Sequence, residues 1–309
     1  MKRLSQLACD KTPFLFYTDF DAMQTHLYTL DELKDADIEF SFENKNYQDH
    51  SHSLVKFPQD FHTYKKGFDT IIEKIKSGET YLLNYTCTTP IQTPLSLKEI
   101  YACANAPFRL RIKDEFVCFS PERFIKIHNN TIYTYPMKGT IDASIPNAQA
   151  KILANAKEMA EHIMVVDLLR NDLSMVAQDV RVSRFRYIDK IQAGEKELLQ
   201  VSSEIQGTLE GSWQNSLGDI LTTLLPAGSI SGTPKKRTLE IIKDIESHKR
   251  QYFTGVFGYF DGESFDSAVM IRFIENTQDG LVYKSGGGIT LESNVHSEYQ
   301  EMLDKIYLP

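Results

Sequence analysis

Two pairs of glutamates have a spacing that could bind a metal ion. Glu158 and Glu161 lie in "KEMAEHIMVV", and Glu298 and Glu301 lie in "HSEYQEMLDKI". In a helix, the i,i+3 spacing puts both carboxylates of a pair on one face. Four carboxylates that meet from two helices would suit Mg²⁺, which prefers oxygen ligands. The alternative is a solvated helix face, although Glu161 directly precedes the apolar run "IMVV", where such a face is less expected.

Lys138 and Glu122 are charged residues at the ends of strand-like segments. Lys138 stands in "YPMKGT", between an apolar pair and a Gly-Thr turn, and Glu122 stands in "SPERF". The lysine is either a solubilising charge at a turn or a nucleophile held beside the core. The glutamate occupies a position from which an acid can project into a cleft, although most glutamates of this kind lie on the surface. The pattern by itself leaves both alternatives open.

A glycine run and an arginine could together bind an anion. Gly286, Gly287 and Gly288 follow a strand in "KSGGGIT". Glycines let the backbone approach a ligand and point several N–H groups into one concavity, an anion-binding nest, although a flexible turn is the alternative. Arg272 interrupts the apolar strand "MIRF", and its planar guanidinium suits a carboxylate of the protein or of a ligand.

The elements that must position these residues are strands in hairpins and helices in blocks. The periodicity predicts helices over 61–77, 147–175 and 293–306, and hairpins at "HNNT" and around Asp279-Gly280. This arrangement favours an α+β fold over a doubly wound sheet. We expect a short, strand-rich segment over 1–60 that joins one main body over 61–309.

Composition excludes several classes of protein. The 309 residues are 41% hydrophobic and 25% charged, and the net charge of −8 argues against sequence-independent nucleic-acid binding. No apolar run is long enough for a membrane span or a secretion signal, so we expect a cytoplasmic protein without membrane contact. The cysteines show no metal-ligand spacing and are expected to be reduced core thiols: Cys9, Cys87, Cys103 and Cys118.

Eight segments in order resemble the chorismate-utilising enzymes, which include anthranilate, aminodeoxychorismate, isochorismate and salicylate synthases. The segments span about 66–307: "SPERF", "PMKGT", "AEHIMVVDLLRNDL", "SSEIQG", "PAGSISGTPK", "GVFGYFDG", "AVMIRF" and "SGGGIT…SEYQE". The resemblance implies two large stacked sheets, antiparallel or mixed, flanked by helices, with the active site between them. It makes 61–309 the chorismate-binding catalytic domain.

The resemblance also implies a role for each candidate residue. Glu161 and Glu301 would hold Mg²⁺ against the ring carboxylate of chorismate, supported through water by Glu158 and Glu298. Glu122 would be the acid that protonates the departing C4 hydroxyl. The residues implied in substrate binding, chiefly of the enolpyruvyl carboxylate, are Tyr259, Arg272, Thr140, Gly286, Gly287 and Gly288.

Two positions distinguish among members of the family. Anthranilate synthases typically carry "PIAGT" and aminodeoxychorismate synthases "PIKGT", whereas this chain has "PMKGT". The strand "GETYLLNYT" lacks the lysine base of the isochorismate and salicylate synthases. Gln200 replaces a histidine that is frequent in the family. The resemblance therefore favours component I of aminodeoxychorismate synthase, in which Lys138 attacks C2 of chorismate and ammonia then attacks C4.

The resemblance further implies a partner. A glutamine amidotransferase subunit would supply ammonia, and the product would serve 4-aminobenzoate and folate synthesis. The alternatives are anthranilate synthase component I and a non-catalytic chorismate-binding subunit. Larger members carry a tryptophan pocket with an "LLES"-type motif, for which no equivalent precedes Lys66, so we expect no feedback by tryptophan.

Overall fold

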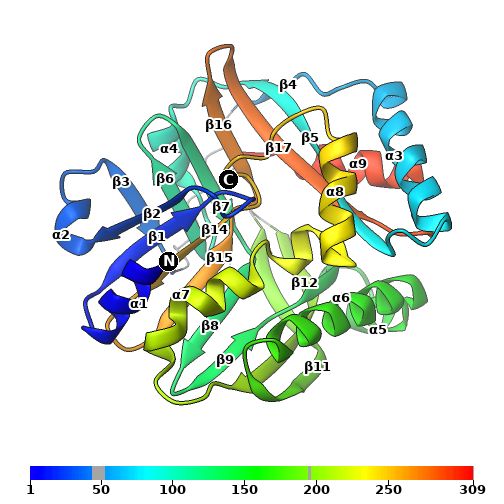
Figure 1. The fold of residues 1–309 in the computed structure, drawn as a ribbon. Coiled ribbons are helices and arrows are strands. Elements are labelled where there is room, and N and C mark those ends of the chain that lie inside the picture. Colours follow the sequence, from blue (N-terminus) through cyan, green and yellow to red (C-terminus); the bar gives the residue numbers. More distant parts are fainter. Residues whose placement is uncertain (44–52, 194–195, 309) are drawn as a thin grey trace.

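The computed structural model describes residues 1–43, 53–193 and 196–308. Within these ranges the strands form two antiparallel sheets, one of nine strands and one of eight (Figure 1). The α+β prediction with two large sheets is therefore confirmed. In addition, none of the helices in these ranges is long and apolar enough to cross a membrane.

The nine-stranded sheet contains the strand of Lys138 at one edge. Its order is β10-β12-β9-β8-β15-β14-β1-β2, and β11 pairs with β12. Its strands are β1 (Phe14–Thr18), β2 (Thr25–Thr29), β8 (Arg123–His128), β9 (Thr131–Thr134), β10 (Met137–Asp142), β11 (Gln178–Ala193), β12 (Lys196–Thr208), β14 (Val256–Phe260) and β15 (Phe265–Val269). The predicted "HNNT" turn joins β8 to β9, and both of its asparagines have positive φ.

The eight-stranded sheet contains the glycine run. Its order is β13-β5-β17-β16-β7-β6-β3, and β4 pairs with β5. Its strands are β3 (Ile38–Ser41), β4 (Val55–Lys56), β5 (Leu82–Gln92), β6 (Phe108–Ile112), β7 (Phe116–Ser120), β13 (Gly232–Thr233), β16 (Phe273–Thr277) and β17 (Gly280–Ile289). The hairpin predicted around Asp279-Gly280 is confirmed as β16–β17.

Helices cover the outer faces of both sheets. Helices α3, α8 and α9 contact the β5–β17 sheet, whereas α6 contacts β11 and β12 and α1 packs on α7 (Figure 1). The helices are α1 (Lys2–Cys9), α2 (Leu30–Leu33), α3 (Phe61–Lys76), α4 (Leu97–Cys103), α5 (Ala148–Ala154), α6 (Ala156–Ser174), α7 (Trp213–Leu224), α8 (Lys235–Ile245) and α9 (Val295–Asp304), with a 3₁₀ turn η1 (Gly228–Ile230).

One helix prediction was wrong in its extent. The single helix expected over 147–175 is two helices, because Asn155 has extended backbone angles and ends α5. Its side chain accepts a hydrogen bond from the backbone N–H of Glu158 and so caps α6. Asparagine competes for backbone hydrogen bonds in a helix interior and is favoured at this capping position. The break therefore fixes the start of α6 and, with it, the position of Glu161 on that helix.

Strand β1 shows why the core lies on both sides of the first sheet. All five of its residues are buried, and alternate side chains enter different clusters. Phe14 and Phe16 pack in the cluster that α1, α6 and α7 cover, while Leu15 and Tyr17 pack between the two sheets. Since successive side chains of a strand point to opposite faces, the two sheets must be stacked with this strand in the interior.

The cysteine expectation holds in part. Cys87 and Cys118 are buried free thiols, as expected. Cys9, however, is exposed at the end of α1 and donates to the side chain of Asn215 of α7 at 2.8 Å.

Candidate active site

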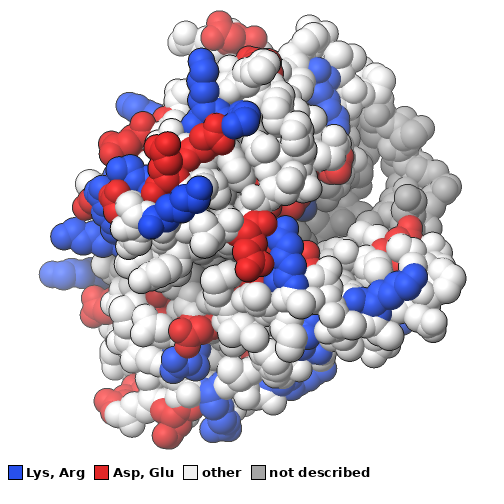
Figure 2. Space-filling model, turned by 90° about the vertical axis from the view of Figure 1, so that its right-hand side faces the viewer, with Lys and Arg blue, Asp and Glu red and all other residues white. Residues whose placement is uncertain are grey.

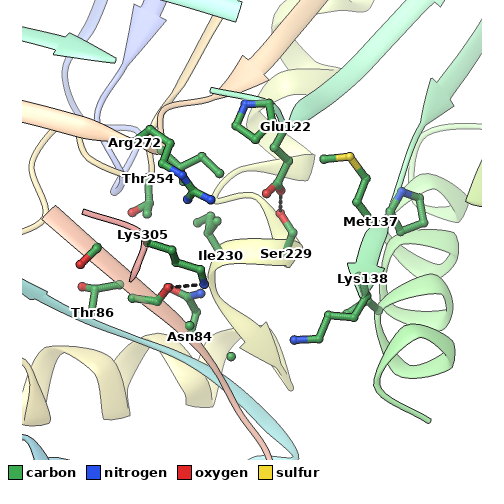
Figure 3. A pocket seen from close by; sticks show the side chains of 18 of the residues that line it. Asn84, Thr86, Glu122, Met137, Lys138, Ser229, Ile230, Thr254, Arg272 and Lys305 are labelled. Carbon is green, nitrogen blue, oxygen red and sulfur yellow. Dashed lines mark hydrogen bonds between the residues drawn. The ribbon is translucent and has the colours of Figure 1, made fainter. Parts of the chain in front are cut away.

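A cavity of about 480 Å³ is lined by residues of both sheets. It takes residues from β5 and β17 of one sheet, from β10 and β12 of the other, and from α6, η1 and the end of α9 (Figure 3). Ten sequence-predicted site residues line it: Glu122, Lys138, Thr140, Glu158, Glu161, Arg272, Gly286, Gly287, Gly288 and Glu301. Residues far apart in the sequence therefore meet here.

A bulge in β10 turns Lys138 toward the cavity. The pairing of β10 with β12 changes register between Met137 and Thr140, and Gly139 has φ +91°. A side chain at Gly139 would be strained by this angle and would meet the Glu158 carboxylate at 3.2 Å. The Nζ of Lys138 lies 2.7 Å from Oε2 of Glu161. The glycine of "MKGT" thus serves to aim the lysine.

The carboxylates around Lys138 keep its amine protonated. Burial by itself lowers the pKa of Lys138, but Glu161, Glu301 and Glu158 outweigh it and raise the pKa above its ordinary value. The Lys138 side chain is 26% exposed, so packing alone does not fix it, and the ion pair with Glu161 contributes to its position. In this arrangement Lys138 is an ammonium ion, and as such it is not nucleophilic.

The two glutamate pairs lie close together at the cavity, joined by Lys157. Glu161 and Glu298 are buried, at 7% and 6% exposure, and Lys157 lies 3.6 Å from Glu161 and 4.0 Å from Glu298. Burial is the main reason that the pKa values of Glu158 and Glu298 are raised. Glu298 lies behind the lining and accepts a hydrogen bond from Ser293.

Lysines lie between these carboxylates. The Nζ of Lys305 is 2.7 Å from Glu301, as that of Lys138 is from Glu161. Over the part of the chain that the structure describes, no three His, Cys, Asp or Glu side chains converge closely enough to hold a metal ion. The donor set is nevertheless all oxygen, and the Glu161 and Glu301 carboxylates already hold lysine ammonium groups. Those properties fit a hard cation such as Mg²⁺.

Glu122 lines the cavity together with Lys138. It immediately precedes β8, and its Oε1 accepts a hydrogen bond from Ser229 (Figure 3). Burial raises the pKa of the Glu122 carboxyl, while Ser229, Arg272 and Lys305 oppose the shift. A carboxyl group whose pKa is raised in this way can act as a general acid near neutral pH.

Arg272 offers a free donor near Glu122. It joins β15 to β16 with φ +52°, and its guanidinium lies 5.7 Å from the ring centre of Tyr307. Its buried Nε has no hydrogen-bond partner among the described residues. A buried donor left without a partner in the protein indicates a place where a ligand acceptor would bind.

The glycine run forms a strand and not a nest. Gly286, Gly287 and Gly288 continue β17 in register with β5, and none of them has positive φ. The prediction of an anion-binding nest was therefore wrong, because the ladder fixes all three in extended conformation. A side chain at Gly287 would stand 3.6 Å from both Glu301 and Lys305, inside the cavity. Gly287 therefore keeps the cavity open beside the strand, whereas a side chain at Gly286 would meet the backbone of β5.

Tyr259 is not among the residues that line the cavity. It lies in β14 with its ring 5.2 Å from that of Phe40 and 6.2 Å from that of Phe42. Its strand turns this side chain toward β3, so the substrate contact expected of it is corrected. Phe253 and Thr254, a few residues earlier, line the cavity instead.

Several lining residues had no assigned role in the sequence. Ser229 lies in "PAGSISG", and Lys305 follows Glu301 by four residues, which is the spacing of a helical ion pair. Lys305 also donates to the carbonyl of Gly286 at 2.7 Å. Asn84 lines the cavity from β5, and Gln200 lies opposite Thr140 in the β10–β12 pairing. Only the Glu301–Lys305 spacing was a signal that could have been used.

Charge on the outside of the molecule is mixed. On the face that Figure 2 shows, basic and acidic side chains are interspersed, without a broad patch of one sign. The concentration of carboxylates and lysines in the cavity therefore has no counterpart on this face.

Comparison with known proteins gives a consistent family. The sequence model described as chorismate binding enzyme matches residues 10–308. A PabA-like protein of Haemophilus influenzae is 48% identical over 304 residues, which cover 97% of this chain and 93% of that protein. Aminodeoxychorismate synthase component 1 of Salmonella typhimurium is 37% identical over 259 residues, which cover 79% of this chain and 56% of that protein.

Two solved structures share the fold. The menaquinone-specific isochorismate synthase of Escherichia coli superposes with a TM-score of 0.68 at 16% identity, covering 99% of this chain and 90% of that one. Anthranilate synthase component I of Streptococcus pneumoniae superposes with a TM-score of 0.67 at 22% identity, covering 85% and 60%. At these identities, the likeness concerns the fold alone.

Proposed function

This chain belongs to the chorismate binding enzyme family, and from that premise we propose that it is component I of an aminodeoxychorismate synthase. It would convert chorismate and ammonia to 4-amino-4-deoxychorismate, with ammonia supplied by a glutamine amidotransferase subunit. The observation that carries the proposal is Lys138, which a bulge and a glycine direct at the carboxylates of the cavity. The 37% identity to a component 1 over 79% of the chain supports the same activity.

The carboxylates would hold the metal. Glu161 and Glu301 would bind Mg²⁺, with Glu158 and Glu298 in support, and the cation would neutralise the ring carboxylate of chorismate. The two lysine ammonium groups now at 2.7 Å from Glu161 and Glu301 occupy the same charge positions. Because Lys138 lies 2.7 Å from Oε2 of Glu161, a cation bound at that oxygen would displace the lysine ammonium group.

The part of the cavity lined by Glu122 and Arg272 would bind and protonate the substrate. The unpartnered Nε of Arg272 would donate to the enolpyruvyl carboxylate of chorismate. Glu122 would hold the proton that the C4 hydroxyl needs in order to leave as water. Its burial supports this role, because it favours the protonated carboxyl.

The chemistry would consist of two displacements. Lys138 first releases its ammonium proton to the solvent of the cavity, and its neutral amine then forms a bond to C2 while the ring double bond shifts and the C4 hydroxyl leaves with the proton of Glu122. Ammonia then forms a bond to C4, the double bond shifts back, the Lys138 amine leaves C2, and the new C4 ammonium group returns a proton to Glu122. Chorismate and ammonia thus give 4-amino-4-deoxychorismate and water, and the lysine is regenerated.

Product analysis tests the proposal. The protein is incubated with chorismate, MgCl₂ and an ammonium salt, and the products are identified by mass spectrometry. We expect 4-amino-4-deoxychorismate, formed only with Mg²⁺ and lost after EDTA treatment. Anthranilate or isochorismate as the main product would overturn the proposal. Chorismate binding without turnover would do so too.

A further inference from the structure

Ser229 is held beside Glu122 at the cavity by contacts that do not involve the substrate. It is the middle residue of η1, and its hydroxyl donates to Oε1 of Glu122 (Figure 3). The turn itself is fixed by Ser231, whose hydroxyl donates to the carbonyl of Ala227 at 2.9 Å and whose own carbonyl accepts from the N–H of Asn84. The hydroxyl of Ser229 is therefore part of a braced turn.

A buried ion pair anchors the same turn from behind. Arg250 and Glu246 each have a side chain 2% exposed, and they are joined by two hydrogen bonds of 2.7 and 2.9 Å. Arg250 also donates to the carbonyl of Ile230 at 2.8 Å and to that of Asn84 at 2.6 Å. These bonds connect η1 to β5, so the turn cannot shift without breaking a buried charge pair.

The hydrogen bond from Ser229 makes the two carboxyl oxygens of Glu122 different from each other, because it involves Oε1 alone. A hydroxyl can donate to an ionised carboxylate and accept from a protonated one, so it can remain bonded throughout a proton transfer. While Oε1 is bonded to Ser229, Oε2 is the oxygen left for a substrate in the cavity. A free carboxyl at the end of a glutamate would otherwise rotate about its last torsion, which is broad.

We propose that Ser229 is a positioning residue for Glu122: its hydroxyl fixes the carboxyl by Oε1, so that the proton is delivered from Oε2. The proposal rests on the role of Glu122 in the proposed function. It assigns to Ser229 no contact with the reacting atoms.

Kinetics of three variants test the proposal. In Ser229→Ala, the carboxylate form of Glu122 loses a donor, so its pKa rises and the alkaline limb of kcat moves up by about one pH unit. We expect kcat to fall about 30-fold with KM within a factor of two. Ser229→Thr keeps a hydroxyl and is expected to keep the wild-type limb.

Ser231→Ala is the matched control. It removes a hydroxyl of the same turn that bonds only to backbone, so it is expected to lower the melting temperature without moving the limb. If Ser229→Ala and Ser231→Ala give the same pH profile, or if Ser229→Ala retains the wild-type kcat, the proposal is wrong.

A measurement without turnover separates this proposal from the proposed function. The carboxyl stretching band of Glu122 is identified by infrared spectroscopy through its loss in Glu122→Gln. We expect Ser229→Ala to shift that band, and Ser229→Thr and Ser231→Ala to leave it in place. An unshifted band overturns the role of Ser229, whereas a wrong product from the wild-type protein overturns only the proposed function.

Discussion

Two clusters of charged side chains contact the paired strands β5 and β17, one at Asn84 and Thr86 and the other at Gly286, and they are built differently. Beneath the cavity, the Glu246 carboxylate accepts from Arg250 and from both the N–H and the hydroxyl of Thr86. In the cavity, Lys138 and Lys305 each hold one carboxylate at 2.7 Å, and four glutamates share three lysines.

The two clusters differ in how fully their carboxylate oxygens are paired with donors of the protein. Every oxygen of Glu246 has partners that the fold fixes, so the buried cluster is a brace that holds β5 and η1 together. The cavity cluster has an excess of carboxylates and a half-exposed Glu301, so its cations can be exchanged. A saturated buried network indicates structure, and an unsaturated one on a cavity indicates a ligand.

The largest expected effect is on activity, from the cavity cluster. Lys138→Ala removes the proposed nucleophile and should lower kcat/KM about 10⁴-fold, the order of loss seen when a nucleophile is removed. The free energy of unfolding should change by less than about 1 kcal/mol, because Glu161 keeps Lys157 at 3.6 Å. Steady-state kinetics and urea unfolding measure the two. A rate equal to that of the wild type would exclude the covalent role.

The next effect is on stability, from the buried cluster. Glu246→Gln leaves the Arg250 guanidinium buried without its carboxylate, which we expect to lower the free energy of unfolding by about 4 kcal/mol. Urea unfolding at pH 7 measures it. Glu301→Gln is the matched control in the cavity and should cost less than about 1 kcal/mol, because Glu301 is 47% exposed. Equal losses of unfolding free energy in the two variants would show that the buried cluster and the cavity cluster do not differ in their contribution to stability.

A third prediction concerns the pH dependence of stability. Burial lowers the pKa of His248, which lies 3.2 Å from the hydroxyl of Thr86, to about 4. Above pH 6.5 this histidine is neutral both folded and unfolded. Between pH 6.5 and 4 only the unfolded chain gains the proton, so the free energy of unfolding falls, by about 3 kcal/mol in total.

His248→Asn keeps a polar side chain without the titration. We expect its free energy of unfolding to fall less than that of the wild type between pH 7 and pH 4, by this same amount. Urea unfolding at several pH values gives the difference. Parallel curves for the two proteins would show that His248 takes up its proton as readily when folded.

The smallest effect is expected on the surface. Asp167 and Arg170 form an exposed i,i+3 pair at 2.7 Å on α6, outside both clusters. Asp167→Asn should change the free energy of unfolding by less than about 0.5 kcal/mol and leave kcat unchanged. Thermal unfolding and the product assay check this. A larger loss of stability would mean that the free-energy cost of removing a charge depends on its position on the helix and not on whether its network is fully hydrogen-bonded.

The sequence predicted the elements better than the contacts between them. Helix α3 and both hairpins follow from local periodicity and turn residues, which act over a few residues. The break at Asn155 and the extended glycines of β17 depend on a cap and on a neighbouring strand, which periodicity does not report. Tyr259 shows the same limit, since its direction is set by β3, far away in the sequence.

The candidate site was predicted as a set of residues and not as an arrangement. The glutamate spacing predicted helical faces, and both faces do lie at the cavity or directly behind it. The hydrogen bond between Ser229 and Glu122 joins residues 107 positions apart, and no local pattern encodes such a contact. The resemblance to a family supplied chemical roles, but it did not indicate that Lys157 and Lys305 lie beside the carboxylates.

Strand β10 lies at the edge of its sheet, and none of its residues is buried. A side chain there can be replaced without disturbing the core, so mutation can vary the chemistry at position 138 at little cost in folding. The proposed nucleophile thus lies at a position that tolerates substitution. Gly139, whose backbone angle a side chain would strain, and the buried Glu246–Arg250 pair do not tolerate it. Such a separation would allow one scaffold to acquire different reactions by single substitutions.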